Sequence, residues 1–155
     1  MAVLSWGKNS IDITPITGTG ATVSAKTTFD KIVEGSTELT TTQGDKTEAK
    51  LEGGALEAVR YANNTYELVW QVRAKAGDYK QLANSDGVVS GEFSLELTAE
   101  NDSAPGIKFA RCSINVQTSY SSADGIITTY TATALKPETG AQCEITKGSK
   151  DTSEA

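Results

Sequence analysis

The sequence contains no histidine, so it lacks the side chain that proteins use most often as a general base and as a metal ligand. A cysteine nucleophile would need a lysine or a carboxylate as its base instead. The glycine pairs form no nucleotide motif, because Gly18-Thr19-Gly20 lacks the third glycine of a dinucleotide site and no Lys-Ser or Lys-Thr follows Gly53-Gly54. We therefore predict that the protein is not an enzyme, has no catalytic residues and holds no metal or cofactor.

Cysteine is scarce as well. Cys112 and Cys143 are too few for a disulfide framework, and their spacing matches no metal site. Long apolar runs are missing, and no stretch approaches the ~20 apolar residues of a membrane-spanning helix. The first residues also lack the basic region that opens an export signal. These absences predict two reduced, half-buried thiols in a soluble protein made in a reducing cytoplasm, with no membrane partner.

Positive charge is in deficit. The chain has 14 Lys and Arg against 20 Asp and Glu, a net charge of −6. Because a surface that grips nucleic acid phosphates needs clustered Lys and Arg, we expect no such surface. The chain is rich in Thr and Ser, and its hydrophobic fraction of 37% is low for a globular protein. This composition favours strands over helices. Its 155 residues are the length of one domain.

Alternating apolar and polar residues predict a mainly β domain over residues 1–147, with one short helix over Asp78–Ala83. The clearest strand is Thr65–Lys75, where Tyr66, Leu68 and Trp70 fall on one face. The other predicted strands are Ser10–Ile16, Thr27–Val33, Thr37–Thr42, Thr47–Leu51, Ala55–Tyr61, Phe93–Thr98, Ile107–Tyr120, Gly125–Leu135 and Gln142–Lys147.

Two of these strands have further features. Between Ile107 and Tyr120 the apolar residues change from odd to even positions, which predicts a β-bulge near Ala110 and Arg111. The strand Gly125–Leu135 is expected to present a row of threonines on one face and to bury the other face, which carries Ile126, Tyr130, Ala132 and Ala134.

Three segments lack a core pattern. Residues 37–54 carry many charges and only two sizeable apolar side chains, Leu39 and Leu51, so we expect this segment to project as a loop or hairpin. Residues 1–9 are predicted to form an amino-terminal arm, in which Trp6 is either an ordinary core aromatic or an interface anchor. Residues 148–155 have the small, polar composition of a chain end.

A family resemblance rests on three features in this order. They are the arm Met1-Ala2-Val3-Leu4-Ser5-Trp6-Gly7-Lys8, the polar segment Glu38–Lys50, and Gly53-Gly54 followed by the amphipathic strand Tyr66–Val72. Together they resemble the tail tube (major tail) proteins of long-tailed bacteriophages, and tube proteins of phages and prophages of gut Bacteroidetes are the most similar. The resemblance covers most of the chain.

The resemblance implies an all-β fold with one short helix, a β-sandwich or barrel of the tail-tube type, related to the tubes of contractile injection systems. Subunits would form rings, commonly hexamers, in which the sheets join between subunits, and the rings would stack into a tube. The protein would be a structural component of the virion tail, assembled in the host bacterial cytoplasm beside other tail proteins. DNA would pass through the tube without being bound specifically.

Two sets of candidate residues follow from this hypothesis. Contacts between subunits and rings are expected from the arm and the projecting segment, at Leu4, Trp6, Leu39, Lys46, Glu48, Lys50, Leu51 and Glu52. The channel lining is expected from acidic and hydroxyl side chains on polar strand faces, because carboxylates repel phosphates. These candidates are Glu67, Glu96, Thr129, Thr131 and Thr133.

A different class of protein has a similar composition. Thr-rich, Gly-punctuated strands with few aromatic residues also occur in immunoglobulin-like modules of surface adhesins and in virion decoration proteins. This alternative stays open at the level of sequence. It predicts a persistent monomer, whereas the tail tube hypothesis predicts rings or tubes.

Overall fold

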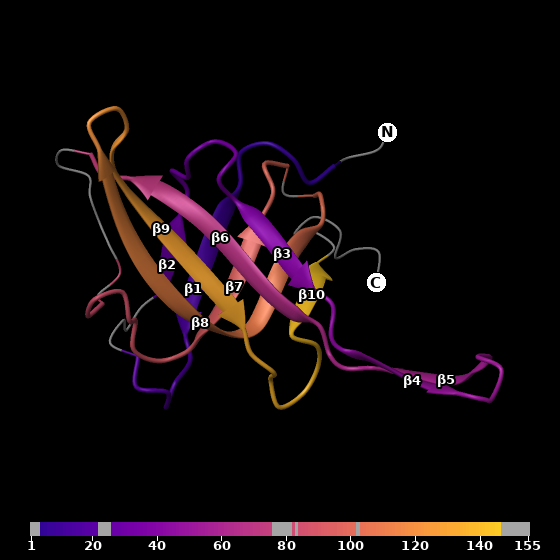
Figure 1. Ribbon diagram of the computed structural model, residues 1–155. Helices are drawn as coiled ribbons and strands as arrows, with labels where there is room; N and C mark the ends of the chain where they lie inside the picture. The colour runs from indigo at the N-terminus through magenta and orange to yellow at the C-terminus, as the bar shows by residue number, and fades with distance from the viewer. Residues whose placement is uncertain (1–3, 22–25, 76–81, 83, 102, 147–155) are drawn as a thin grey trace.

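The computed structural model describes residues 4–21, 26–75, 82, 84–101 and 103–146. In this part of the chain the protein is all-β and contains no helix (Figure 1). Apart from Leu82, the helix predicted over Asp78–Ala83 and the tail predicted over 148–155 lie outside the described residues. The strands are β1 (Ser10–Pro15), β2 (Thr27–Phe29), β3 (Glu38–Thr42), β4 (Lys46–Lys50), β5 (Leu56–Tyr61), β6 (Thr65–Arg73), β7 (Phe93–Thr98), β8 (Gly106–Ser121), β9 (Gly125–Ala134) and β10 (Cys143–Thr146).

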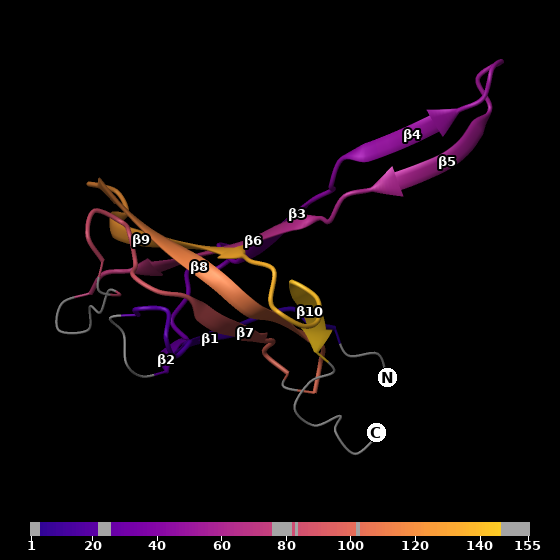
Figure 2. The same cartoon turned by 90° about the horizontal axis from the view of Figure 1, so that it is seen from below.

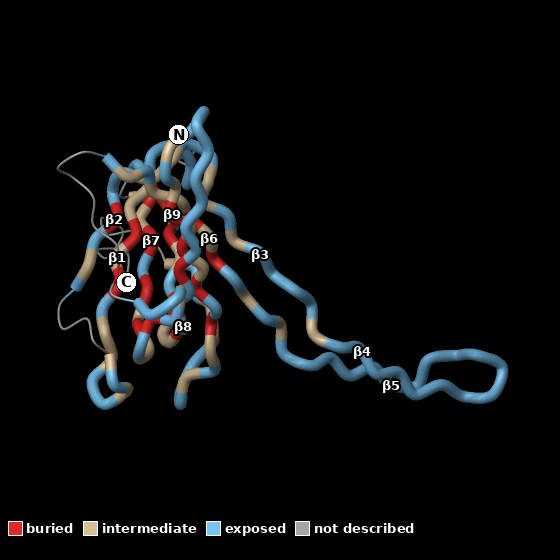
Figure 3. Tube along the Cα trace, turned by 60° about the vertical axis from the view of Figure 1, so that its left-hand side comes forward, coloured by how far each residue is buried: buried red, intermediate tan, exposed pale blue. Residues whose placement is uncertain are grey.

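One large antiparallel sheet forms the body of the protein. Its strand order is β2-β1-β7-β8-β9-β6-β3, and β10 pairs with the first part of β8. The segment after β2 also reaches β6, because Ile32 forms a bridge with Val72 and the amide of Val33 donates to the carbonyl of Gln71 at 2.9 Å. The sheet therefore curls around a core, where Figure 3 shows the buried residues. The strands β4 and β5 form a separate two-stranded sheet that stands away from this body (Figure 2).

The core is built by the apolar faces of the alternating strands. At its centre, Trp70 of β6 lies opposite Tyr130 of β9, with ring centroids 5.5 Å apart and planes inclined by 15°. Phe29 packs on both rings, at 5.5 Å from Trp70 and 4.8 Å from Tyr130. The other buried apolar residues of this cluster are Ile11, Ile13, Leu68, Leu82, Val89, Phe93, Leu95, Leu97, Phe109, Cys112, Ile114, Val116, Ala132 and Ala134.

The predicted bulge in β8 is confirmed. Phe93 of β7 lies opposite Cys112, while Leu95 lies opposite Phe109, so Ala110 and Arg111 share the place opposite one residue of β7. The extra residue lets Phe109 and Cys112 both point into the core although their positions differ in parity. The bulge thus explains the change from odd to even apolar positions.

An ion pair holds the bulge in place. The guanidinium of Arg111 donates to both carboxylate oxygens of Glu92, from Nε at 2.9 Å and from an Nη at 2.6 Å, and its other Nη donates to the carbonyl of Lys136 at 3.0 Å. This pair lowers the pKa of Glu92 and raises the pKa of Arg111, chiefly through the shared hydrogen bonds. The side chain at the bulge therefore joins the start of β7 to the segment that follows β9.

Two strand predictions need correction. Ile126 was expected in the core but is 43% exposed, and its partner Tyr120 is 74% exposed, because the β8–β9 hairpin extends past the core (Figure 1). Thr128, on the same face, is buried instead. The strand predicted over Thr27–Val33 ends at Phe29, and Ile32 forms an isolated bridge beyond it.

Both cysteines are free thiols, as predicted, although Cys112 is fully buried and only Cys143 is half-buried. Cys143 lies on β10 opposite Phe109. Burial raises the pKa of the Cys112 thiol to about 12, and it also raises the pKa of Cys143. Since the thiolate is the reactive form, neither thiol is activated for nucleophilic chemistry.

We expect alkylation to distinguish the two thiols. In native protein without reductant at about pH 8, an alkylating reagent should label Cys143 slowly and leave Cys112 unmodified, because Cys112 is buried and protonated. In denaturant both thiols should be labelled, as measured by intact mass. A denatured protein that takes up no label and weighs two hydrogens less would contain a disulfide and would contradict this assignment.

Candidate assembly interface

A long two-stranded ribbon leaves the body of the protein. In β3 and β6, Thr42 lies opposite Thr65, and in β4 and β5, Lys46 lies opposite Tyr61, so the pairing register continues unchanged between the two sheets. The amide of Ala62 donates to the carbonyl of Asp45 at 2.8 Å within the intervening stretch. The ribbon β3–β4/β5–β6 therefore carries its outer half, residues 46–61, away from the core (Figure 2). We call residues 46–61 the projecting hairpin.

A glycine permits the narrow junction between the ribbon's two halves. The amide of Gly44 donates to the side-chain oxygen of Asn64 at 3.1 Å. A Cβ atom at position 44 would lie 2.2 Å from the carbonyl oxygen of Ala62, closer than any real contact. Any other residue would therefore displace the opposite strand.

The projecting segment begins later than we predicted. We expected residues 37–54 to project, but β3 lies in the main sheet, and Leu39, opposite Leu68, is half-buried against the core of its own subunit. In contrast, every residue of β4 and β5 is exposed (Figure 3). The predicted contact residues Lys46, Glu48, Lys50, Leu51 and Glu52 all lie on the projecting hairpin or its turn.

One face of the projecting hairpin combines charged and apolar side chains. Cross-strand partners share a face, so the row Lys46, Glu48 and Lys50 on β4 lies beside Tyr61, Val59 and Leu56 on β5. Glu48 bridges both lysines, at 2.9 Å from the ammonium of Lys46 and 3.8 Å from that of Lys50. The apolar row is 40–56% exposed. The opposite face carries Thr47, Ala49, Ala58 and Arg60.

The apolar row was not among our predicted contacts. Leu56 and Val59 differ in parity, so simple alternation does not place them together. A register shift between Ala49 and Lys50 sets Lys50 opposite Leu56, and this irregularity brings Leu56 to the side of Val59. The signal in the sequence is that Leu56, Val59 and Tyr61 are large apolar residues in a strand next to the segment predicted to project.

The tip of the projecting hairpin is a glycine turn. The amide of Leu51 donates to the carbonyl of Ala55 at 2.8 Å, and Gly53 and Gly54 both have a φ of 91°. No heavy atom lies within 4 Å of a Cβ built on either glycine, so the turn is surrounded by open space. Leu51 is 52% exposed at this tip, and the adjacent Glu52 is exposed as well.

The described part of the amino-terminal arm, residues 4–9, is attached to the body but exposes its two large apolar side chains. The hydroxyl of Ser5 donates to the carbonyl of Pro105, and the amide of Lys8 donates to the carboxylate of Glu100 at 3.4 Å. Leu4 is 57% exposed and Trp6 is 73% exposed. Trp6 is therefore not a core aromatic of its own subunit. Its role as an interface anchor stays a prediction.

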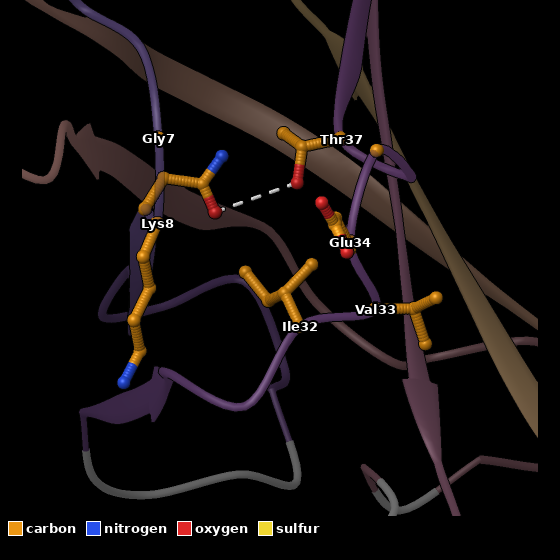
Figure 4. Close-up of a pocket in the computed structure, with 8 residues that line it drawn as sticks. Gly7, Lys8, Ile32, Val33, Glu34 and Thr37 are labelled. Carbon is orange, nitrogen blue, oxygen red and sulfur yellow. Dashed lines mark hydrogen bonds between the residues drawn. The ribbon is translucent and has the colours of Figure 1, made fainter.

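A pocket of about 510 Å³ lies between this arm and the segment that precedes β3 (Figure 4). Residues Gly7, Lys8 and Asn9 form one wall, and residues 32–35 with Thr37 form the other. The two walls are joined where the hydroxyl of Thr37 donates to the side-chain oxygen of Asn9 at 3.5 Å. The pocket is therefore at the opposite end of β3 from the projecting hairpin.

The predicted channel-lining residues of β6 and β9 share one face of the sheet. Glu67 lies opposite Thr133, and Thr131 and Thr129 follow along β9 on the side turned away from the core. β8 continues this surface with uncharged polar side chains, namely Ser113, Asn115, Gln117 and Ser119. The structure thus brings four of the five predicted residues together on one polar face of the sheet.

Glu96 is separated from that row. It lies on β7 between Asp12 of β1 and Lys108 of β8, on the same outer side of the curved sheet. Apart from Arg111 at the bulge, acidic side chains predominate among the charged residues of this outer side in the described strands. They are Asp12, Glu38, Glu67, Glu96 and Glu144, against Arg73 and Lys108.

The described residues offer neither a metal site nor a membrane-spanning helix. In the described ranges, no three His, Cys, Asp or Glu residues are grouped so that they could bind a metal ion. No helix in that same part of the chain has the length and apolar character needed to cross a membrane. A comparison of the whole chain with models of protein families and with curated proteins finds no match.

Proposed function

We propose that the protein is a structural virion subunit that assembles with copies of itself into the tail tube of a long-tailed bacteriophage. Rings of subunits, hexameric as in the family it resembles, stack into a tube in the host bacterial cytoplasm and join other tail proteins. DNA passes through this tube to the host without specific binding. The observation that carries the proposal is the projecting hairpin, which has no cover within its own subunit.

The energetics of the projecting hairpin favour contact with another subunit. An isolated two-stranded hairpin is marginally stable in water, because ordering each residue costs about 1–2 kcal/mol of backbone entropy. Here the apolar row Leu56, Val59 and Tyr61 remains largely exposed. Exposed apolar side chains gathered on one face are typical of interaction sites, and their burial contributes about 25 cal/mol per Å². A neighbouring subunit would supply the missing cover.

The sheet edges favour the same arrangement. β3 lies at one end of the strand order, and β10 pairs with β8 on one side, so both leave an edge without a strand partner among the described residues. Unpaired edges promote association between chains. Edge-to-edge contacts that repeat with a rotation close into rings, which is the sheet joining expected of a tail-tube-type barrel.

The polar outer face of the main sheet suits the wall of a DNA channel. Its central part, around Thr129, Thr131 and Thr133, is hydroxyl-rich, and acidic side chains such as Glu67 and Glu96 predominate among its charges. Carboxylates repel phosphates, whereas clustered Lys and Arg would hold them. We therefore assign this face to the channel.

Sedimentation velocity over a range of protein concentrations tests the proposal. We expect the monomer to give way to rings or to much larger particles as the concentration rises. A monomer that persists at the highest concentration would contradict the proposal and would favour the alternative, an immunoglobulin-like adhesin or a virion decoration module.

A further inference from the structure

The pocket beside the amino-terminal arm carries opposite charges on either side of an apolar centre. Lys8 lies on the arm, Glu34 lies on the facing segment, and Ile32 lies between them (Figure 4). Lys8 and Glu34 are exposed, and neither forms an ion pair with another described residue. Ile32 is half-buried against the core, so part of its side chain remains available to the pocket.

The tip of the projecting hairpin carries the complementary pattern. Lys50 ends β4, Leu51 follows with 52% exposure, and Glu52 begins the glycine turn. Lys50 has only a long contact of 3.8 Å with Glu48, and its side chain stays 59% exposed. Glu52 has no ion pair within the described part of the chain. The tip thus presents a cation, an apolar side chain and an anion in that order. The pocket presents the opposite charges in the matching order, with Glu34 and Lys8 on either side of Ile32.

We infer that the pocket receives the hairpin tip of a second copy of this chain. In this contact Glu52 pairs with Lys8, Lys50 pairs with Glu34, and Leu51 packs toward Ile32. The inference rests on the proposed self-assembly and names the surface that accepts the projecting hairpin. Charge complementarity supports it and fixes the orientation of the tip in the pocket.

A subunit cannot make this contact with itself. The pocket wall at residues 32–35 and Thr37 precedes β3, and the projecting hairpin follows β3, whose five residues separate the two surfaces by about 17 Å of extended strand. The projecting hairpin continues beyond that point, away from the segment that precedes β3 (Figures 1 and 2). Donor and acceptor are thus different surfaces of one subunit, and such a head-to-tail contact propagates from copy to copy.

A charge-swap experiment on the full chain tests the pairing. The variants Lys8→Glu and Glu52→Lys should each raise the concentration needed for assembly roughly tenfold, because each places like charges together in every repeated contact. The double variant Lys8→Glu/Glu52→Lys should restore assembly to near the wild-type concentration. The second pair, Glu34→Lys with Lys50→Glu, should behave in the same way.

Glu57→Lys provides the matched control. Glu57 is an exposed carboxylate of the projecting hairpin, outside the Lys50–Glu52 tip, so its reversal should leave assembly nearly unchanged. Circular dichroism of each variant checks that these exposed positions leave the fold intact. If wild-type protein assembles but the single variants assemble equally well, or the double variants fail to recover, the pocket is not the acceptor. If wild-type protein does not assemble at all, the proposed function itself fails.

Discussion

Removal of the projecting hairpin is expected to leave a folded subunit that no longer assembles. The amide of Ala62 is hydrogen-bonded to the carbonyl of Asp45, so a short Gly-Ser linker can replace residues 46–61 without straining the ribbon. None of the removed residues is buried, and the core is untouched. The free energy of unfolding should therefore change by less than about 1 kcal/mol. Urea denaturation and sedimentation velocity measure the two effects.

A pair of substitution variants separates the two faces of the hairpin. Val59→Ser/Tyr61→Ser removes apolar area from the face that we assign to a neighbouring subunit, whereas Thr47→Ser/Ala58→Ser changes the opposite face. We expect the first variant to assemble poorly and the second to assemble almost normally. A linker variant that unfolds would show that residues 46–61 belong to the subunit core, and one that still forms large particles would show that assembly depends on other surfaces.

Loss of the central aromatic side chain is expected to have the largest effect on stability. Trp70 is fully buried, stacks on Tyr130 and touches Phe29, so Trp70→Ala leaves a large cavity at the middle of the core. Such substitutions cost about 3–5 kcal/mol, a large share of the ~5–15 kcal/mol that stabilises a typical domain. Urea denaturation should show a much lower midpoint or an unfolded protein.

Glu67→Gln is the control for this variant. Glu67 lies on the same strand but points away from the core, so its substitution should change the unfolding free energy by at most about 0.5 kcal/mol. A Trp70→Ala protein as stable as the wild type would mean that the aromatic trio does not form the centre of the core.

The strands that build the core, β1, β6, β7, β8 and β9, could be predicted from the sequence because apolar and polar residues alternate along them. The change of parity within β8 even located the bulge, since Phe109 and Cys112 must both reach the core. Ile126 was misplaced for a related reason. The alternation of apolar and polar residues shows which face of a strand is turned toward the core. It does not show how far along the strand the core extends, and the first residues of β9 lie beyond the core.

The candidate interface could be predicted only in part. Low apolar content identified a projecting segment. Leu39 nevertheless packs in its own subunit, because β3 pairs with β6. Local composition does not show which strands pair when they are distant in the sequence. The pocket was not predicted, since Lys8 and Glu34 come together only when the arm folds back beside the segment that precedes β3. Geometry of this kind depends on tertiary contacts rather than on local patterns.

Electron microscopy of the assembled protein distinguishes a tail tube from any other assembly. We expect stacked rings that form a hollow tube, in which each projecting hairpin lies against a neighbouring subunit. The polar face with Glu67, Thr129, Thr131 and Thr133 should line the channel. Particles that remain single subunits under all conditions, or a tube whose channel is lined mainly by Lys and Arg, would contradict the proposed function.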